Sequence, residues 1–270
     1  NRTLSAAEVQ QLYLAGANYK KEAVQLYLAG EGCYVKDKGF WESVPKSDLF
    51  VLESFVYVTD WHKQFIPKFK SFMLDSGAFS FMQNSTLICN WDEYVRRYAD
   101  FINQNNIKLF FELDIDSVVG LKEVERLRDK LETLTNKQSI PVWHKSRGKD
   151  YWVKMVKNYN YIAIGGIVSG EITKDEHKFF TPLINLAKEQ GTKVHGLGYT
   201  NLEGLKKYKF DSVDSTAWTY GNRSGFVQWF DGQTLQKIKA KQGSKMKAKE
   251  TAIHNFNEWV KFQRYAEKYL

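Results

Sequence analysis

The chain has 270 residues, of which 43% are hydrophobic and 15% aromatic. This apolar content excludes a mainly disordered chain, and the length suits one α/β barrel or two small domains. No run of about 18 apolar residues and no signal-peptide pattern occurs, so we expect no transmembrane helix and no membrane partner. The two cysteines, Cys33 and Cys89, exclude a disulfide framework and a multi-cysteine zinc site, and they predict a cytoplasmic protein.

The positive charge of the chain is concentrated at its C-terminal end. The formal net charge is +8, and residues 236–270 alone carry nine basic and three acidic side chains. A run without any acid among its members is formed by Lys237, Lys239, Lys241, Lys245, Lys247 and Lys249. Such a run is either a solvated face or a contact for a phosphate backbone, because closely spaced lysines release counterions when they bind a polyanion. Both interpretations stay open.

The N-terminal part contains a short duplication. The six residues 11–16 recur unchanged as residues 25–30, and each copy ends in glycine. A glycine at the end of an amphipathic stretch is typical of a helix C-terminus, so we expect two short helices here. The predicted domains are a helical extension over residues 1–45, a barrel over 46–235 and a basic helical segment over 236–270.

From residue 48 onward, apolar runs of strand length alternate with helix-like stretches. The predicted strands are residues 49–55, 72–75, 107–114, 140–143, 161–164, 193–197, 212–214 and, more weakly, 226–230. The predicted helices are residues 91–105, 119–134, 149–158, 174–190, 202–208 and 248–270. This alternation indicates parallel βα units and predicts a (β/α)8 TIM-like barrel. A doubly wound open sheet is the alternative, but the chain lacks its usual glycine-rich loop after the first strand.

Aspartates stand at the ends of three predicted strands, namely Asp75, Asp114 and Asp214. Because active sites of such barrels form where the strands end, we expect the three carboxylates to share one pocket. They suit chemistry with one carboxylate as nucleophile and another as proton carrier. Two alternatives remain: each aspartate could simply cap the next helix, or the first two could bind a metal with Asp116 and His144.

Five motifs, in this order along the chain, resemble those of the tRNA-guanine transglycosylases, especially of their phage and bacterial DNA-modifying relatives. They are Asp-Ser-Gly-Ala-Phe at 75–79, Leu-Asp at 113–114, Gly-Gly-Ile-Val-Ser-Gly-Glu at 165–171, Gly-Leu-Gly at 196–198 and Asp-Ser-Val-Asp at 211–214. That family has a barrel fold and exchanges guanine in a nucleic acid for a free 7-deazaguanine base. The resemblance covers residues 72–216.

The resemblance also implies a role for each matched residue. Asp214 would be the nucleophile, forming a covalent glycosyl-aspartyl intermediate on a flipped-out guanine nucleotide, and Asp75 would carry the proton. No cofactor is implied. The base would be bound by Ser76, Asp114, His144, Gly165, Gly166, Ile167, Glu171, Gly196 and Gly198.

Two departures from the family bear on the substrate. The tRNA-acting members hold a structural zinc ion with three cysteines and a histidine, which Cys33 and Cys89 cannot supply. Residues 218–223, ending at Arg223, replace the basic stretch that follows the nucleophile in those enzymes. We therefore expect DNA rather than tRNA as the partner, with Arg223 and the lysine run as its contacts and no bound metal. A tRNA enzyme, a small-molecule TIM-barrel lyase or hydrolase, and a non-catalytic nucleic-acid-binding protein are the alternatives.

Overall fold

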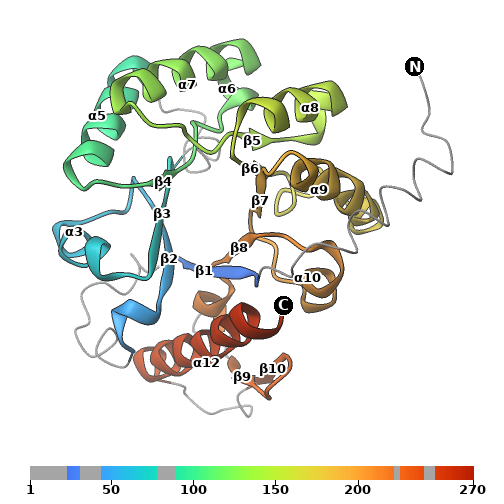
Figure 1. Cartoon of the computed structure of the whole chain (residues 1–270). Coiled ribbons are helices and arrows are strands. Elements are labelled where there is room, and N and C mark those ends of the chain that lie inside the picture. The colour runs from blue at the N-terminus through green and yellow to red at the C-terminus, as the bar shows by residue number, and fades with distance from the viewer. Residues whose placement is uncertain (1–22, 31–43, 78–88, 222–225, 240–246) are drawn as a thin grey trace, which may run out of the picture.

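A computed structural model describes residues 23–30, 44–77, 89–221, 226–239 and 247–270. Eight parallel strands form one sheet, with helices around it (Figure 1), in the order β4-β3-β2-β1-β8-β7-β6-β5. An isolated parallel bridge between Phe111 and Ile140 joins the two outer strands of this order. The fold is therefore an α/β TIM-like barrel, which confirms the predicted class. None of the helices in the described part is both long and apolar enough to cross a membrane.

The barrel strands are short, and each begins at the same end of the molecule. They are β1 (Gln25–Ala29), β2 (Phe50–Ser54), β3 (Ser71–Asp75), β4 (Leu109–Phe110), β5 (Val142–Trp143), β6 (Tyr161–Ile164), β7 (Lys193–Gly196) and β8 (Ser212–Ser215). Successive side chains alternate between the two faces of each strand. The inward side chains form an apolar cluster inside the barrel, in which Tyr27, Phe50, Met73 and Phe111 are buried. The outward side chains pack against the helices.

The helices surround this ring of strands. The α-helices are α3 (Asp60–Phe65), α5 (Trp91–Gln104), α6 (Asp116–Val119), α7 (Leu121–Thr135), α8 (Gly148–Asn158), α9 (Phe180–Glu189), α10 (Leu202–Tyr208) and α12 (Ala248–Tyr269). The 3-10 turns are η2 (Lys46–Asp48), η3 (Ile66–Lys68), η4 (Lys145–Arg147), η5 (Lys174–Phe179) and η6 (Ala217–Thr219). Local sequence signals fix several starts: the Asn90 side chain, for example, accepts a hydrogen bond from Glu93 N at 3.1 Å and caps α5.

Strand β1 corrects the predicted N-terminal helices. Residues 25–29 form a buried strand between β8 and β2, in which Leu26 pairs with Val213 and Leu28 with Val51. A run of six residues that is apolar on both faces fits a short helix and a buried strand equally well. Its periodicity therefore does not distinguish the two structures. The barrel therefore begins at β1, and the expected boundary at residue 45 falls inside it. The first copy of the repeat, residues 11–16, lies outside the described residues.

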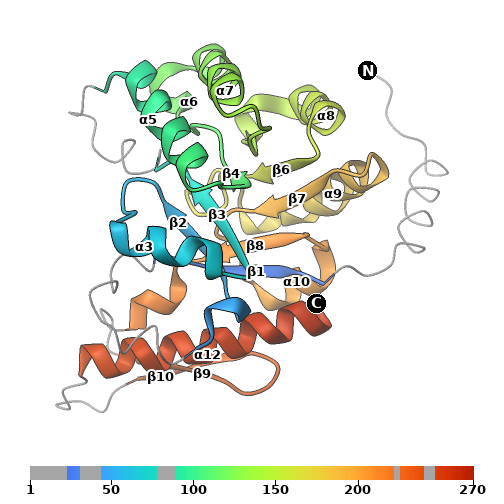
Figure 2. The ribbon, with the colours of Figure 1, turned by 60° about the vertical axis from the view of Figure 1, so that its left-hand side comes forward.

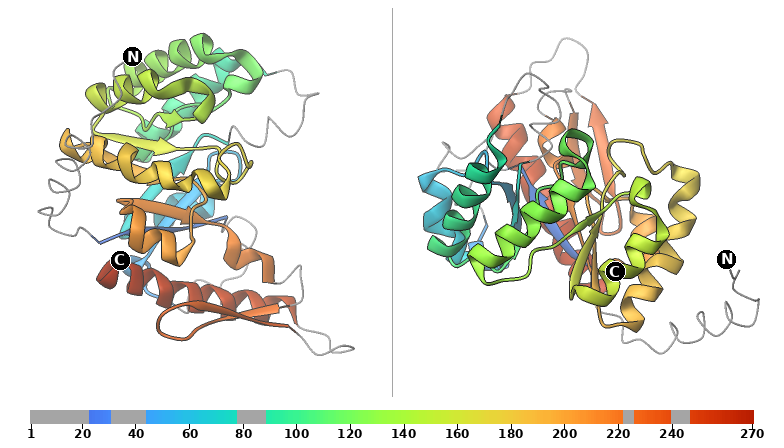
Figure 3. Two further views of the ribbon diagram at one scale, coloured as in Figure 1. Left: turned by 90° about the vertical axis from the view of Figure 1, so that its right-hand side faces the viewer. Right: turned by 90° about the horizontal axis from the view of Figure 1, so that it is seen from above.

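The eighth predicted strand exists but does not belong to the barrel. Strand β9 (Phe226–Phe230) pairs antiparallel with β10 (Leu235–Lys239), and this hairpin packs against α12 (Figures 2 and 3). The expected basic helical segment over 236–270 therefore starts with a strand. Its helix begins only at Ala248.

Helix α12 covers the outer face of β1 and β2 (Figure 2). The side-chain amide of Gln263 donates to Leu26 O at 2.7 Å and to Phe50 O at 3.0 Å. Near its start, Phe256 packs on Trp218 of η6, which directly follows β8. Helix α12 therefore runs antiparallel to the strands and begins at their carboxyl ends, where active sites of this fold lie.

Candidate active site

Asp75 is the last residue of β3, and the turn that follows holds its carboxylate. Its Oδ2 accepts a hydrogen bond from Gly77 N at 2.9 Å. Gly77 has a φ of +78°, and a Cβ there would lie 2.4 Å from Cγ2 of Val56, so only glycine fits. Helix α5 fixes the same turn from outside, because the Tyr94 hydroxyl donates to Ser76 O at 2.6 Å.

The surroundings of Asp75 favour its protonated form. Burial raises the pKa of Asp75 to about 6; the Gly77 hydrogen bond opposes this, and the charges of Asp114, Asp214 and Glu53 add to it. Asp114 and Asp214 therefore both lie within electrostatic range of Asp75. A carboxyl group with such a pKa can both give and take a proton near neutral pH.

Asp214 on β8 is held differently, by two partners at one of its oxygens. Its Oδ1 accepts a hydrogen bond from Gly198 N at 2.7 Å and lies at hydrogen-bond distance, 3.1 Å, from Nε2 of His195. Two N–H donors on one oxygen stabilise a carboxylate. Gly198 reaches Asp214 from a left-handed turn with a φ of +68°, and a Cβ there would lie 2.2 Å from Cγ2 of Val168. Among the described residues, no hydrogen bond to Oδ2 of Asp214 is found.

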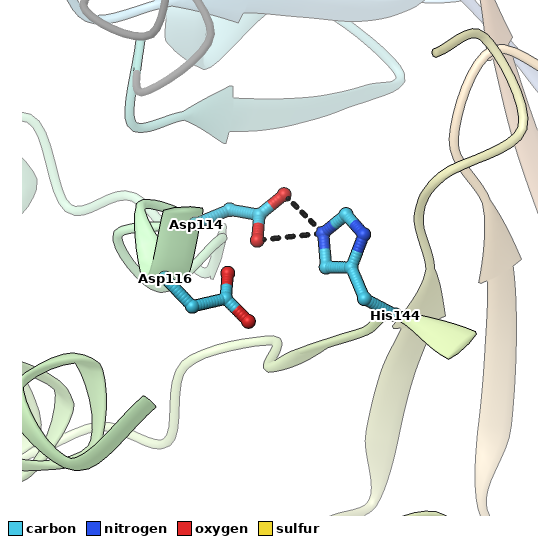
Figure 4. A group of neighbouring side chains, drawn as sticks. All are labelled: Asp114, Asp116 and His144. Atoms are coloured by element: carbon cyan, nitrogen blue, oxygen red, sulfur yellow. Dashed lines mark hydrogen bonds and ion pairs between the residues drawn. The ribbon is translucent and has the colours of Figure 1, made fainter. Parts of the chain in front are cut away.

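His144 at the end of β5 lies between two carboxylates. Its Nε2 is 2.8 Å from Oδ1 of Asp114, and its Nδ1 is 2.9 Å from Oε2 of Glu171. The other oxygen of Glu171 accepts from Ser146 N at 2.8 Å. A Cβ at Gly165 would lie 2.8 Å from Cε1 of the ring, so this glycine makes room for the histidine. Figure 4 shows the ring pointing at Asp114.

The two carboxylates keep His144 charged. Burial alone would lower the pKa of His144, but its hydrogen bonds to Asp114 and Glu171 and the charge of Asp116 raise it to about 9. Burial likewise opposes the charge of Glu171, but Ser146 N and His144 hold its pKa below the usual value. This cluster therefore offers both donors and acceptors to a polar ligand at the rim.

A buried ion-pair network beneath the rim has no counterpart among the predicted site residues. Oε1 of Glu112 accepts from Val142 N and from Nη1 of Arg147, both at 2.8 Å, and Oε2 accepts from Nη1 of Arg128 at 2.8 Å. Arg147 also donates from Nε to Asp116 at 2.8 Å. The one sequence signal is Glu112 itself, an acid inside an apolar strand run.

Asp114, Asp116 and His144 also have the geometry of a possible metal site (Figure 4). One ligand atom from each lies within 4.8 Å of the other two. However, Nη2 of Arg147 lies 3.6 Å from Asp114, and its Nε bonds to Asp116. A divalent cation would have to compete with this guanidinium and with the charged ring of His144. The negative charge of the cluster is thus already balanced by protein groups.

The remaining predicted base-binding residues differ in their surroundings. Ser76 is fully buried, and no described residue bonds to its Oγ. Gly166 has a φ of +77°, and a Cβ there would lie 2.8 Å from Oε2 of Glu171, while Ile167 packs partly on the core. At Gly196 a Cβ would lie 3.0 Å from Cε1 of Phe210, so the absence of a side chain there also serves packing outside the barrel.

The predicted nucleic-acid contacts are described only in part. Lys237 and Lys239 are exposed on β10, and Lys247 and Lys249 are exposed at the start of α12. A Cβ at Gly221, just after η6, would lie 2.5 Å from Phe226 O, and Phe226 pairs with Lys239. These lysines therefore lie toward the carboxyl end of the barrel, as the aspartates do. The other predicted contacts, Arg223, Lys241 and Lys245, lie outside the described residues.

The chain matches no protein-family model and no curated protein. Among solved structures, it resembles a putative fructose-1,6-biphosphate aldolase from Coccidioides immitis, with 12% identity, a TM-score of 0.51 and coverage of 98% of this chain and 93% of that one. It also resembles the carboxyl transferase domain of Rhizobium etli pyruvate carboxylase, with 14% identity and a TM-score of 0.48. That match covers 99% of this chain and 53% of the other, about half of its length. The likeness to the aldolase shows the fold alone, and neither protein is named as a guanine transglycosylase.

Proposed function

We propose that the chain is a guanine transglycosylase, which replaces guanine in DNA with a free 7-deazaguanine base. The observation that carries this proposal is the contrast between Asp75 and Asp214 at one rim. Burial raises the pKa of Asp75 to about 6, whereas Oδ1 of Asp214 accepts from Gly198 N and lies 3.1 Å from Nε2 of His195. Two carboxyl groups with opposite environments supply a proton carrier and a nucleophile. The five motifs that resemble the transglycosylase family assign the same roles.

In the first half of the proposed reaction, Asp214 displaces guanine. An oxygen of its carboxylate forms a bond to C1′ of the nucleotide, while the bond from C1′ to N9 of guanine breaks. The electron pair of that bond leaves with the purine, which takes the proton of Asp75. The products are a glycosyl ester on Asp214, ionised Asp75 and neutral guanine.

In the second half, the 7-deazaguanine base enters the vacated position. Asp75 takes the proton from its N9, N9 bonds to C1′, and the ester bond breaks, so the carboxylate of Asp214 is restored. Two displacements at one carbon give net retention, as in retaining glycosidases. The proton returns to Asp75, and no cofactor is consumed.

The cluster around His144 suits the polar edge of a purine. Guanine presents N–H donors beside a carbonyl acceptor, so its reader needs an acceptor and a donor in one plane. Asp114 supplies acceptor oxygens, and the ring of His144 supplies N–H donors when charged. A bound base would replace the bonds that these groups now make with each other.

The exposed lysines suit a polyanionic substrate. Lys237, Lys239, Lys247 and Lys249 lie toward the same end of the barrel as the aspartates. They would contact phosphates sequence-independently, while the target nucleotide is flipped into the site, because C1′ cannot be reached inside a duplex.

The test is incorporation of radiolabelled guanine into polymer. The wild-type protein is incubated with single-stranded DNA, duplex DNA or tRNA, with Asp214→Asn as the matched control. Label retained by DNA supports the proposal, and label retained only by tRNA would move the substrate to RNA. No incorporation into any of the three would overturn the proposed function.

A further inference from the structure

We propose that His195 is a positioning residue for Asp214, and that a buried chain of hydrogen bonds from Tyr161 through Ser212 favours donation from Nε2 of His195. The inference rests on the proposed function in one respect, namely that Asp214 is the nucleophile. His195 and Tyr161 lie outside the motifs that resemble the transglycosylase family, and Ser212 stands between the two aspartates of the last motif, at a position that the family leaves open.

The chain of hydrogen bonds crosses the barrel interior from one end toward the other. Nε2 of His195 lies 3.1 Å from Oδ1 of Asp214, and its Nδ1 lies 2.5 Å from Oγ of Ser212. The same Oγ is hydrogen-bonded to the hydroxyl of Tyr161. Ser212 and Asp214 are two residues apart on β8, so both side chains face the barrel interior. His195 and Ser212 have no exposed surface.

The position of each proton follows from the role proposed for Asp214, which attacks as a carboxylate. A carboxylate only accepts hydrogen bonds, so His195 must donate from Nε2. The neutral ring then accepts at Nδ1, which makes the Ser212 hydroxyl the donor to it. Ser212 Oγ in turn accepts from the phenol of Tyr161. Burial raises the pKa of Tyr161 well above its usual value, which keeps this phenol a donor.

The ring of His195 has little freedom to turn away. Phe111 and Tyr27 pack against it edge to face, with centroid distances of 5.4 Å and 6.2 Å. These two residues belong to the apolar cluster inside the barrel. The imidazole is therefore fixed by contacts with two aromatic rings and by hydrogen bonds at both nitrogens.

This arrangement makes the two oxygens of Asp214 unequal. Gly198 N and His195 Nε2 both donate to Oδ1, so Oδ2 is the oxygen that attacks C1′. When Oδ2 bonds to C1′ and the bond to N9 breaks, Oδ1 becomes the carbonyl oxygen of the ester and keeps its donors. When the ester breaks in the second half, the electron pair returns to the carboxylate, and the same donors stabilise it as it leaves.

The first measurement does not depend on activity. Nitrogen-15 NMR of the histidine ring should show His195 neutral and protonated at Nε2 in the wild-type protein. The Ser212→Ala variant should show a weaker preference, because Nδ1 then has no donor and Asp214 alone favours the proton at Nε2. A ring protonated at Nδ1 in the wild type would overturn the inference, whatever the protein does to DNA.

The second measurement uses the exchange reaction. His195→Phe keeps a ring but removes the donor, and we expect kcat to fall by ~10–100-fold with KM for the incoming base nearly unchanged. His195→Gln keeps an N–H near the position of Nε2 and should recover much of the rate. Ser212→Ala, a smaller change, serves if His195→Phe does not fold. Wild-type kcat in both His195→Phe and Ser212→Ala would overturn the inference, whereas an inactive wild type would count against the proposed function alone.

Discussion

Nε2 of His144 lies 2.8 Å from Oδ1 and 2.9 Å from Oδ2 of Asp114, so one ring nitrogen spans both oxygens of the carboxylate. Burial of the ring lowers the pKa of His144, but Asp114 on one side and Glu171 on the other outweigh this effect. The pKa of His144 therefore rises from 6.5 to about 9. A raised histidine pKa stabilises the fold fully below the unfolded value. We therefore expect the pair to stabilise the protein up to about pH 6.5, and this contribution to fade as the pH rises through 9.

The measurement is the free energy of unfolding in urea between pH 6 and pH 9.5. Relative to His144→Gln, which keeps polar contacts without the charge, the wild type should lose a few kcal/mol at most over this window. Parallel curves for the two proteins would mean that His144 is not charged in the folded state.

The roles proposed for Asp75 and Asp214 can be separated by conservative substitution. Asp214→Asn should abolish exchange with fold and substrate binding retained, because an amide is a far weaker nucleophile. Asp75→Asn should lose ~10²–10⁴-fold in rate and keep slow activity, the usual range for acid–base assistance. Denaturing gels of protein incubated with DNA, without an incoming base, should show a covalent adduct for the wild type and none for Asp214→Asn. An adduct that persists in Asp214→Asn and vanishes in Asp75→Asn would reverse the two roles.

Glu112 should matter for stability more than any residue of the predicted site. Glu112→Gln leaves the guanidinium groups of Arg128 and Arg147 buried without their shared carboxylate. Breaking a buried ion pair in this way costs about 3–5 kcal/mol. Glu203→Gln is the matched control, since Glu203 pairs with Lys206 at 3.3 Å at the surface and should contribute less than about 1 kcal/mol. Equal urea midpoints for the two variants would contradict the structural role of the network.

The lysines of the hairpin should contribute to DNA binding without sequence preference. Replacing Lys237 and Lys239 by Gln should weaken binding to all sequences and reduce the salt slope of log K by up to ~0.9 for each phosphate that is no longer neutralised. The control pair is Lys108 and Lys193, which are exposed at the starts of β4 and β7, the opposite end of the barrel. If both double variants bind alike over a range of salt, the lysine run is only a solvated face.

We expect the protein to purify without stoichiometric zinc. Cys33 and Cys89 cannot build the cysteine site of the tRNA enzymes, and Arg147 occupies the acidic cluster around Asp116. Elemental analysis of the purified protein checks this, with its melting temperature measured with and without a chelator. One zinc ion per chain, or a melting temperature that falls with chelator, would require a ligand set among the Asp and His residues instead.

Seven of the eight barrel strands could be predicted because each is an apolar run followed by a recognisable helix or turn. Strand β1 could not, because its six-residue run has no period that excludes a helix. The sequence pattern instead assigns the eighth place to β9, which is wrong because its pairing with β10 is local and antiparallel. Only the strand pairing in the structure shows that the apolar run of β1 lies between β8 and β2.

The aspartates at the strand ends could be named from the sequence because the ends of apolar strands can be recognised there. Asp75, Asp114 and Asp214 follow apolar runs, and parallel strands bring such positions together. The partners of these residues depend on which side chains face inward on neighbouring strands. His195 reaches Asp214 across 19 positions of sequence, and Glu112 reaches Arg147 across 35. Neither pairing produces a recognisable local sequence pattern, so only the structure shows them.

The hydrogen bond from Gln263 to Leu26 has a consequence for folding during synthesis. The two residues are 237 positions apart, and β1 also waits for β8 to supply one of its two neighbours. During synthesis, β1 therefore leaves the ribosome long before its edge can be paired or covered. Unpaired apolar edges promote aggregation, and closing such distant contacts slows folding. A ribosome-stalled chain that ends before residue 212 should accordingly remain protease-sensitive and bind chaperones that a finished chain releases.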